Sequence, residues 1–396
     1  MEPIEITTGG LLLRPWRPED ADAVCRACQD PDIQRWTTVP RPYLREHAVT
    51  FVTGFGGPEA WASGRSVPLG VFDAATGELL GSHGLVSIDG TTAEIGYWTA
   101  PTARGRGVAT VAGRAVARLA TERLGITRLV WRAGLGNHGS RLVARRIGFT
   151  MEGLLLGGHE HRDGTREDCW VGSLRPGEIT DTTPAHLSAG SPAARRAAVF
   201  GAPQPTLALT GAEGMLRPYV EADIPRTVEA CRDPATVEWT PVPADYRESD
   251  AVDYIGRAPR AWLRGDGAIW VIADADGAYC GAADIGVSAD DPGVAEVGYQ
   301  VAPWARGKGL ATAATRTIVD WGFDELGLER ILWSARIGNH ASRRVAEKVG
   351  FRSEGVARAR FTQRGTRRDM WVAAMLAADR RDGHVPAQTE EVPERA

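Results

Sequence analysis

The feature that most constrains this chain is an internal duplication. The segment AEIGYWTAPTARGRGVAT at 93–110 agrees at 12 of 18 positions with AEVGYQVAPWARGKGLAT at 295–312. Further along, GLGNHGSRLVARRIGF at 134–149 agrees at 9 of 16 positions with RIGNHASRRVAEKVGF at 336–351. Repeats of this length are whole domains rather than the 20–50-residue units of a solenoid. The 396 residues are therefore predicted to form two similar domains of about 175 residues each.

The duplication also sets the predicted domain boundaries. We predict an N-terminal domain at 1–178, a linker at 179–206, a C-terminal domain at 207–380 and a disordered tail at 381–396. The linker is rich in Ala, Pro, Ser and Thr and has no convincing helical or strand period. The tail is polar and interrupted by proline, as is typical of frayed chain ends.

Composition restricts the class of protein. Charged residues make up 24% of the chain and hydrophobic residues 43%, which is typical of globular domains. A net charge of −4 argues against a partner that binds through phosphate neutralisation, so no nucleic acid is expected. The absence of a signal-like N-terminus, of a long apolar run and of a disulfide-type cysteine pattern predicts a cytoplasmic protein without a membrane partner. Cys25 and Cys28 form a CxxC without a second pair, so no metal site is predicted.

The pattern within one repeat predicts a mixed sheet with helices packed on it. Strands are expected in GLLLRPW, in a hairpin around the turn AATG, and in AEIGYWT, ITRLVWRA and CWVGSL. Helices are expected in PEDADAVCRACQD, around 45–55, in the long segment ended by Gly125, and in HGSRLVARRIG. The order β-α-α-β-β-β-α-β-α-β predicts an α+β (mixed α/β) fold for each domain.

The turns ARGRGVAT and ARGKGLAT each lie between a predicted strand and the start of a long helix. Helix starts expose unpaired N–H groups and the positive end of the helix dipole, which together bind anions. Gly105, Gly107 and the small Ala109 would let phosphates approach the backbone. Neither turn has the P-loop pattern or the dinucleotide fingerprint. A pyrophosphate cradle is the interpretation that fits, and the alternative is a glycine turn with no ligand.

With their neighbours, these turns resemble the GNAT superfamily of acyl-CoA-dependent N-acyltransferases. ARGRGVA and ARGKGLA match its R/Q-x-x-G-x-G/A signature, and LRP, DP…WT, GYW, N-x-x-S and the final G…D…W resemble the RimJ/RimL-type branch. The resemblance covers about residues 10–175 and 213–376. It implies two tandem GNAT folds, each a mixed, mostly antiparallel sheet flanked by helices. It also implies acetyl-CoA as the cofactor and an amine-bearing acceptor.

The resemblance implies catalytic roles for two pairs of residues. Glu94 and Glu296 stand two residues before a glycine on a strand, where each could act as a base or position a water. The alternative is a glutamate on an exposed strand face. The tyrosine that many GNAT enzymes use as an acid is replaced by alanine in both repeats. Ser140 and Ser342 could instead hydrogen-bond the departing thiolate, although serine is also favoured in the first turn of a helix.

Contacts to the cofactor are implied for the strand end, the glycine turn and the asparagine that opens the shorter helix. The asparagine could also be only a helix cap. These residues are Trp98, Thr99, Arg104, Gly105, Arg106, Gly107, Val108, Ala109, Thr110, Asn137, Gln300, Val301, Arg306, Gly307, Lys308, Gly309, Leu310, Ala311, Thr312 and Asn339.

The expected activity is transfer of acetyl from acetyl-CoA to a primary amine, which for RimJ/RimL-type relatives is most often the N-terminal α-amine of a protein or peptide. Two alternatives stay open: acetylation of a small antibiotic or metabolite, and an acyl-CoA-binding regulatory or scaffold protein in which one or both units do not turn over. The repeats differ where the acceptor should bind, as at Trp98 and Gln300. The sequence also leaves open whether the two domains pack as an intramolecular pseudo-dimer.

Overall fold

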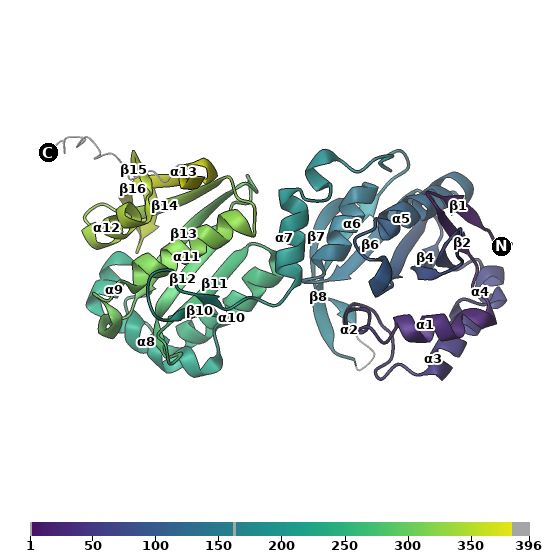
Figure 1. Ribbon diagram of the computed structural model, residues 1–396, viewed down its shortest axis with the longest axis horizontal. Helices are drawn as coiled ribbons and strands as arrows, with labels where there is room; N and C mark the ends of the chain where they lie inside the picture. Colours follow the sequence, from purple (N-terminus) through teal and green to yellow (C-terminus); the bar gives the residue numbers. More distant parts are fainter. Residues whose placement is uncertain (1, 161–163, 382–396) are drawn as a thin grey trace. The chain divides into compact units, whose positions relative to one another are not determined.

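A computed structural model describes residues 2–160 and 164–381 and divides the chain into two compact units, which meet in sequence at Ser191 and Pro192 (Figure 1). Each unit is built on one eight-stranded sheet with helices packed against it. Both sheets are mixed and mostly antiparallel, which confirms the predicted fold class. No described helix is both long enough and apolar enough to cross a membrane.

Unit 1 begins with two short strands and a helical layer before the main part of its sheet. Its strands are β1 (Ile6–Thr8), β2 (Leu11–Arg14), β3 (Val67–Asp73), β4 (Leu79–Asp89), β5 (Thr92–Thr99), β6 (Arg128–Gly134), β7 (Thr150–Glu160) and β8 (Arg166–Leu174). Its α-helices are α1 (Ala21–Ala27), α2 (Pro31–Trp36), α3 (Arg45–Thr50), α4 (Pro58–Ser63), α5 (Val108–Arg118) and α6 (His138–Ile147). Shorter 3₁₀ or π turns are η1 (Pro18–Asp20), η2 (Phe51–Phe55), η3 (Pro101–Ala103), η4 (Leu119–Arg123) and η5 (Ala185–Leu187).

Unit 2 repeats this order. Its strands are β9 (Leu207–Ala208), β10 (Met215–Arg217), β11 (Gly267–Ala273), β12 (Tyr279–Val287), β13 (Val294–Val301), β14 (Arg330–Arg336), β15 (Arg352–Gln363) and β16 (Thr366–Leu376). Its α-helices are α7 (Pro192–Gly201), α8 (Ile224–Arg232), α9 (Pro234–Trp239), α10 (Glu248–Arg264), α11 (Leu310–Asp324), α12 (His340–Val349) and α13 (Ala377–Arg381). The 3₁₀ turns η6 (Glu221–Asp223) and η7 (Pro303–Ala305) complete it.

One parallel strand pair organises each sheet. The strand order is β1-β2-β3-β4-β5-β6-β8-β7 in unit 1 and β9-β10-β11-β12-β13-β14-β16-β15 in unit 2. Neighbours are antiparallel except β5 with β6 and β13 with β14. Parallel neighbours need a crossover, and the helices α5 and α11 provide it. The glycine turns therefore lie at the start of the crossover helices.

Two helical layers enclose the sheet of unit 1, as Figure 1 shows for α5 and α6 on one face and α1 and α3 on the other. Ala112 and Val116 of α5 pack on alternate residues of the central strands, such as Ile95 and Leu129. The apolar side chains on one face of the strands thus pack against the apolar face of the helix. The opposite layer packs on the aromatic side chains of Trp16, Phe72 and Trp98.

The segment predicted as a linker, 179–206, is folded against both units. In unit 1, the Thr180 hydroxyl donates to the Arg146 carbonyl at 2.6 Å, and the Arg146 side chain donates to the Leu187 carbonyl at 2.6 Å. In unit 2, Phe200 of α7 is 2% exposed and packs edge-to-face on Trp262 with ring centroids 4.9 Å apart. Apart from Arg381, the predicted tail lies outside the described residues.

The burial of Phe200 predicts that α7 is part of the folding unit of unit 2. Phe200→Ala should lower the stability of that unit by about 3–5 kcal/mol, because removal of a buried aromatic ring loses its transfer energy and leaves a cavity. Hydrogen exchange resolved by peptide should then accelerate in unit 2 alone. Arg195→Ala, on the exposed side of the same helix, should change little. Equal acceleration in both units, or in neither, would contradict this role.

Candidate active site

The parallel strands separate half-way along their length. In unit 1, Thr92–Ile95 pair with Arg128–Trp131, after which β5 continues to Thr99 bonded to β4 alone. In unit 2, the parallel ladder ends at Glu296, while β13 continues to Val301 beside β12. The edge of each strand beyond this point faces a wedge between the parallel strands. Its backbone groups can bond a ligand there.

The glycine turn follows the end of the separated strand. Gly105 and Gly107 have φ of 74° and 79°, and Gly307 and Gly309 have φ of 77° and 79°. Residues with side chains rarely adopt this left-handed conformation. A Cβ added at any of the four would meet no atom within 4 Å, so the turn is open on its outer side. In the described structure no acceptor bonds the amides of Gly105–Val108 or Gly307–Leu310.

The first arginine of each turn forms an ion pair with an aspartate. Arg104 donates to Asp30 at 2.5 Å, and Arg306 donates to Asp233 at 2.5 Å. Asp30 and Asp233 cap the short helices α2 and α9 by accepting the amides of Ile33 and Thr236 at 2.9 Å. Burial opposes the charged form of Asp30, but the hydrogen bonds from Arg104 and the helix amides outweigh it and lower the pKa of this carboxyl. The arginines therefore tie the turn to the DP element.

The other cation of each turn has no such partner. Arg106 and Lys308 are exposed, and within the described part of the chain neither makes an ion pair. With the amides at the start of α5 and α11, they offer donors and positive charge that suit an anion. Thr110, in the first turn of α5, is buried.

The two glutamates lie on the sheet face opposite α5 and α11. Glu94 accepts from Arg132 of β6 at 2.9 Å and its side chain is 28% exposed. Glu296 accepts from the Ser334 hydroxyl at 2.5 Å and lies 3.6 Å from Arg360, with its side chain 41% exposed. Both carboxylates reach solvent beside the wedge, and both are already engaged by a neighbouring donor.

Each serine is held in a hydrogen-bonded cluster with a tyrosine and a tryptophan. The Tyr97 hydroxyl donates to the Ser140 carbonyl at 3.0 Å and bonds Ser140 Oγ at 2.9 Å, and Trp131 Nε1 donates to the same Oγ at 3.1 Å. Asn137 caps α6 by accepting the Ser140 amide at 3.1 Å. Burial raises the pKa of Tyr97 to about 12 although its bonds to Ser140 and Trp131 lower it, so the hydroxyl keeps its proton at neutral pH.

Unit 2 repeats the cluster with one change. Tyr299 bonds both the carbonyl and Oγ of Ser342 at 3.0 Å, and Asn339 caps α12. Here Trp333 Nε1 donates to the Tyr299 hydroxyl at 3.0 Å rather than to the serine. Sequence reasoning missed these tyrosines and tryptophans. The signal was available, because GY follows the glutamate after one intervening residue in both repeats.

The faces that carry the glutamates differ between the units. Trp98 stacks on Trp16 with ring centroids 6.4 Å apart, within an aromatic cluster that includes Phe51 and Phe72. At the matching place in unit 2, Gln300 donates to Cys231 Sγ at 3.6 Å. The residues around it are polar aromatic side chains and one carboxylate: Tyr219, Tyr246, Tyr254, Tyr279 and Asp284.

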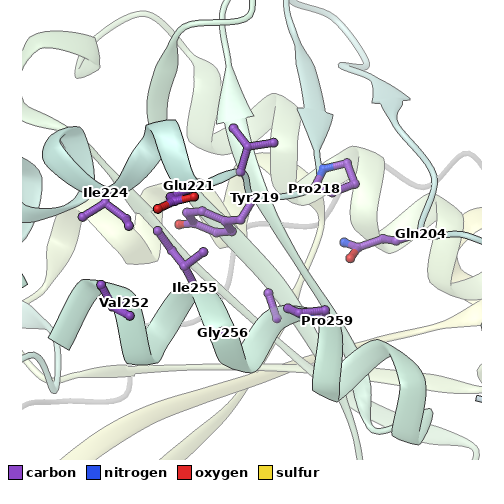
Figure 2. Close-up of a pocket in the computed structure, with 11 residues that line it drawn as sticks. Gln204, Pro218, Tyr219, Glu221, Ile224, Val252, Ile255, Gly256 and Pro259 are labelled. Atoms are coloured by element: carbon purple, nitrogen blue, oxygen red, sulfur yellow. The ribbon is translucent and has the colours of Figure 1, made fainter. Parts of the chain in front are cut away.

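A pocket of about 360 Å³ opens beside this face of unit 2. It is lined by the segment from Pro218 to Ile224 and by α10 residues from Val252 to Pro259. Figure 2 shows the Tyr219 ring in the middle of the pocket, next to Ile255. Most of the lining is apolar, so the pocket suits an apolar group.

Comparison with known proteins agrees with this geometry. A family model described as an acetyltransferase (GNAT) domain matches residues 10–150 and, separately, residues 215–352, which is more than half of the chain. The chain belongs to the GNAT acetyltransferase family. GNAT acetyltransferases use acetyl-CoA, so the wedge and the glycine turn of each GNAT unit lie where the family's acyl donor is expected.

Relatives of known name cover parts of this GNAT chain. It is 37% identical over 101 residues to "Putative ribosomal N-acetyltransferase YdaF" of Bacillus subtilis (strain 168), a match over 26% of this chain and 55% of that protein. The chain thus spans about half the length of this curated relative. Among solved structures, it is similar to Mycobacterium smegmatis RimJ in complex with CoA-disulfide (26% identity, TM-score 0.40, 44% of this chain and 87% of that one). It is also similar to RimL, a ribosomal L7/L12 alpha-N-protein acetyltransferase in complex with coenzyme A (16% identity, TM-score 0.40, 43% and 98%).

Asp284 has a consequence for the stability of the GNAT unit that contains it. Burial, and then the negative charge of Glu296, raise the pKa of Asp284 from 3.8 to about 6. The folded state therefore keeps a proton that the unfolded chain releases between about pH 4 and pH 6. The free energy of unfolding falls as the pH rises through this window.

Asp284→Asn should remove this loss of unfolding free energy at higher pH. We expect the variant to have a higher Tm than the wild type at pH 7.5 and the same Tm at pH 4, measured by differential scanning calorimetry. Asp290→Asn removes an exposed carboxylate of the β12–β13 loop and should leave Tm unchanged at both pH values. A Tm of Asp284→Asn that is lower than wild type at pH 7.5 would show that the ionised carboxylate is stabilising.

Proposed function

We propose that this protein is a tandem N-acetyltransferase in which both units transfer the acetyl group of acetyl-CoA to a primary amine. We propose that this amine is the N-terminal α-amine of a protein or peptide. The observation that carries the proposal is the duplicated site: in each unit, two left-handed glycines start a helix beside the point where the parallel strands separate. One such turn could be structural, but two equivalent turns at two equivalent wedges indicate a repeated ligand site.

The residues of each turn fit the diphosphate of coenzyme A. The amides at the start of α5 and α11 provide donors, and Arg106 and Lys308 provide charge. The Oδ1 of Asn137 and Asn339 is used in the helix cap, which leaves the amide NH₂ group of each side chain to contact the cofactor chain. Acetyl-CoA supplies an activated acetyl thioester.

The strand edge next to the wedge supports the transfer. Backbone amides around Trp98 and Gln300, which the parallel ladder does not use, can donate to the acyl carbonyl as its oxygen gains negative charge. Glu94 and Glu296 reach solvent beside this edge and can position the water or accept the proton of the amine.

The serine cluster supports departure of the thiolate. Each tyrosine hydroxyl has one proton, which it can give to the serine carbonyl or to the serine Oγ. When the proton goes to Oγ, the serine O–H can donate to a sulfur in the wedge. The tyrosine proton is retained at neutral pH because burial raises the pKa of Tyr97 and of Tyr299 to about 12. The serine thus acts as a hydrogen-bond donor that the tyrosine orients.

The choice of acceptor is supported by the name of the relative YdaF, which describes a ribosomal N-acetyltransferase. A small-molecule amine is the alternative within the same chemistry. The alternative of another class is an acyl-CoA-binding regulatory or scaffold protein, in which binding persists without turnover.

The first test is calorimetric titration of acetyl-CoA into the full-length protein. We expect two sites per chain in the wild type and one in Gly107→Glu or Gly309→Glu, because each change puts bulk and negative charge against the diphosphate. Gly125→Glu and Gly327→Glu are matched controls: these glycines follow the crossover helices at the end opposite the glycine turn and have φ of 67° and 65°. They impose similar backbone strain away from the site, so both should keep two sites.

The result separates the possible arrangements. One site that is lost in only one of the two variants would make the other unit a non-binding scaffold. Absence of acetyl-CoA binding by the wild type would overturn the proposed function. Binding at two sites with no acetylated product from peptides or small amines would favour the regulatory alternative.

The serine cluster makes a separate prediction for catalysis. The double variant Ser140→Ala/Ser342→Ala should lower kcat by roughly 10²-fold, the effect expected for loss of one donor to a developing charge. The affinity for acetyl-CoA should stay the same. Release of free CoA can be followed with a thiol reagent and a panel of peptides with unblocked N termini. Tyr97→Phe/Tyr299→Phe should lower kcat less, because the serine keeps its own proton. An unchanged kcat in the serine variant would assign Ser140 and Ser342 to the helix turn alone.

A further inference from the structure

The Asp284 carboxylate of unit 2 lies over strand β13 beside the wedge. Asp284 of β12 pairs directly with Gly298 of β13. Gly298 lies two residues after Glu296 on that strand. A Cβ added to Gly298 would lie 2.7 Å from Asp284 Oδ1 and 3.1 Å from Oδ2. The carboxylate therefore occupies the space that a side chain of residue 298 would fill, on the same face as Glu296.

This carboxylate lacks a protein counter-charge. Among the described residues, Asp284 makes no ion pair and no side-chain hydrogen bond, and it is partly buried beneath the helical layer. The negative charge of Glu296 acts on it and, after burial, raises its pKa further. Buried carboxylates are normally paired or hydrogen-bonded. Two adjacent carboxylates without a cation between them suit a positively charged ligand.

Tyrosine hydroxyls gather near this part of unit 2, and Tyr254 is the one that interacts with Asp284. Tyr279 is 4% exposed, and its hydroxyl lies close to the hydroxyl of Tyr219 and to the side chains of Thr227 and Gln300. Burial raises the pKa of Tyr254, and the nearby Asp284, Tyr279 and Cys231 raise it further, which places these groups in one cluster. These hydroxyls make this face of unit 2 polar, which suits a polar acceptor.

Unit 1 has an apolar group in the same place. A β-bulge between Leu85 and Ser87 turns Val86 over Gly96, where an added Cβ would lie 2.5 Å from Val86 Cγ1. Gly84, which pairs with Gly96, stands at the strand position of Asp284. The neighbouring side chains of unit 1 are also less polar than those of unit 2. Where unit 2 has Tyr219, Tyr254, Tyr279 and Gln300, the matching positions of unit 1 are Trp16, Phe51, Leu79 and Trp98.

We propose that Asp284 is the acceptor-binding group of unit 2: with Glu296 it binds the ammonium form of a cationic primary amine and makes this unit selective for such acceptors. Unit 1, with Val86 and an aromatic face, takes acceptors whose group next to the amine is apolar. The proposal deepens the acetyltransferase function proposed above and rests on it. It assigns different acceptor classes to the two units of one chain.

The carboxylate can also receive the proton that the acceptor must lose. The ammonium R–NH₃⁺ gives one proton to Asp284 and becomes R–NH₂. The nitrogen lone pair then forms a bond to the acyl carbon as the carbon–sulfur bond breaks, and the electron pair leaves on sulfur. The second proton lost by nitrogen neutralises the thiolate, and Asp284 releases its proton to solvent. The products are the N-acetyl amine, free CoA and one proton.

The groups that face Asp284 suit this exchange. Glu296 of β13 carries the negative charge that helps Asp284 accept a proton, and Arg360 of β15 approaches the outer oxygen of Glu296 at 3.6 Å. From the helical side, Tyr254 of α10 is the neighbouring titratable group, and its hydroxyl stays neutral. Amine binding should therefore weaken as the pH falls through about 6, where Asp284 takes up a proton without a ligand.

The test is calorimetric binding of 1,4-diaminobutane to the full-length protein saturated with CoA, with the uncharged 1,4-butanediol as the matched probe. We expect the diamine to bind and the diol not to bind. Asp284→Asn should weaken diamine binding at least tenfold and leave the affinity for acetyl-CoA unchanged. Asp290→Asn, which removes an exposed carboxylate of the same unit, should bind like the wild type. Diamine binding by the wild type from pH 5 to pH 8 provides a second measurement that needs no variant.

Each result decides the proposal. Diamine binding that Asp284→Asn does not weaken, no diamine binding by the wild type, or binding that does not fall below pH 6 would overturn it. A parallel assay for acetylated amine separates this proposal from the proposed function. Asp284-dependent binding without any acetylated product would leave the binding site standing and refute the transferase. Acetylation of the diamine at an unchanged rate in Asp284→Asn would refute the role of Asp284 and leave the transferase standing.

Discussion

The single parallel strand pair in each sheet is the constraint on which the site depends. Two parallel neighbours must be joined by a crossover, so a helix has to start close to the end of β5 or β13. Because the parallel ladder ends at Ile95 or Glu296, the strand edge beyond it lies beside the wedge. The start of the helix and this edge therefore meet at one place. The free amides of the glycine turn and the unpaired strand edge are two consequences of the same topology.

The two units share the backbone part of the site and differ in its side chains. The glycine turns agree in all four left-handed φ angles, and the tyrosine–serine cluster is repeated almost bond for bond. A cradle made of amides tolerates little change, because a side chain at Gly107 or Gly309 needs a strained φ. The acceptor face is made of side chains and can change without altering the fold. Trp98 and Gln300 show how far it has changed.

Much of the fold could be predicted because its signals are local. The alternating strands, the cap residue of each short helix and the glycine turn depend on neighbours within a few residues. The partners of the site residues could not be predicted. Arg104 was expected to contact the cofactor, and its bond to Asp30, which lies 74 positions earlier in the chain, was not foreseen. Tyr97 was not identified, although it contacts Ser140 across a crossover of 43 residues. A local sequence pattern gives no sign that residues so far apart in the chain are in contact.

The sequence by itself determined that there are two units, that each has a glycine turn able to adopt left-handed φ, and that each helix begins where it does. These properties follow from side-chain size and local hydrogen bonding. Only the tertiary structure decided which group covers the strand beside the wedge. Val86 reaches Gly96 because a bulge shifts the register of β4, whereas an unbroken register puts Asp284 over Gly298. Register depends on the packing of the whole sheet, so this difference between the two units appears only when the strands are paired.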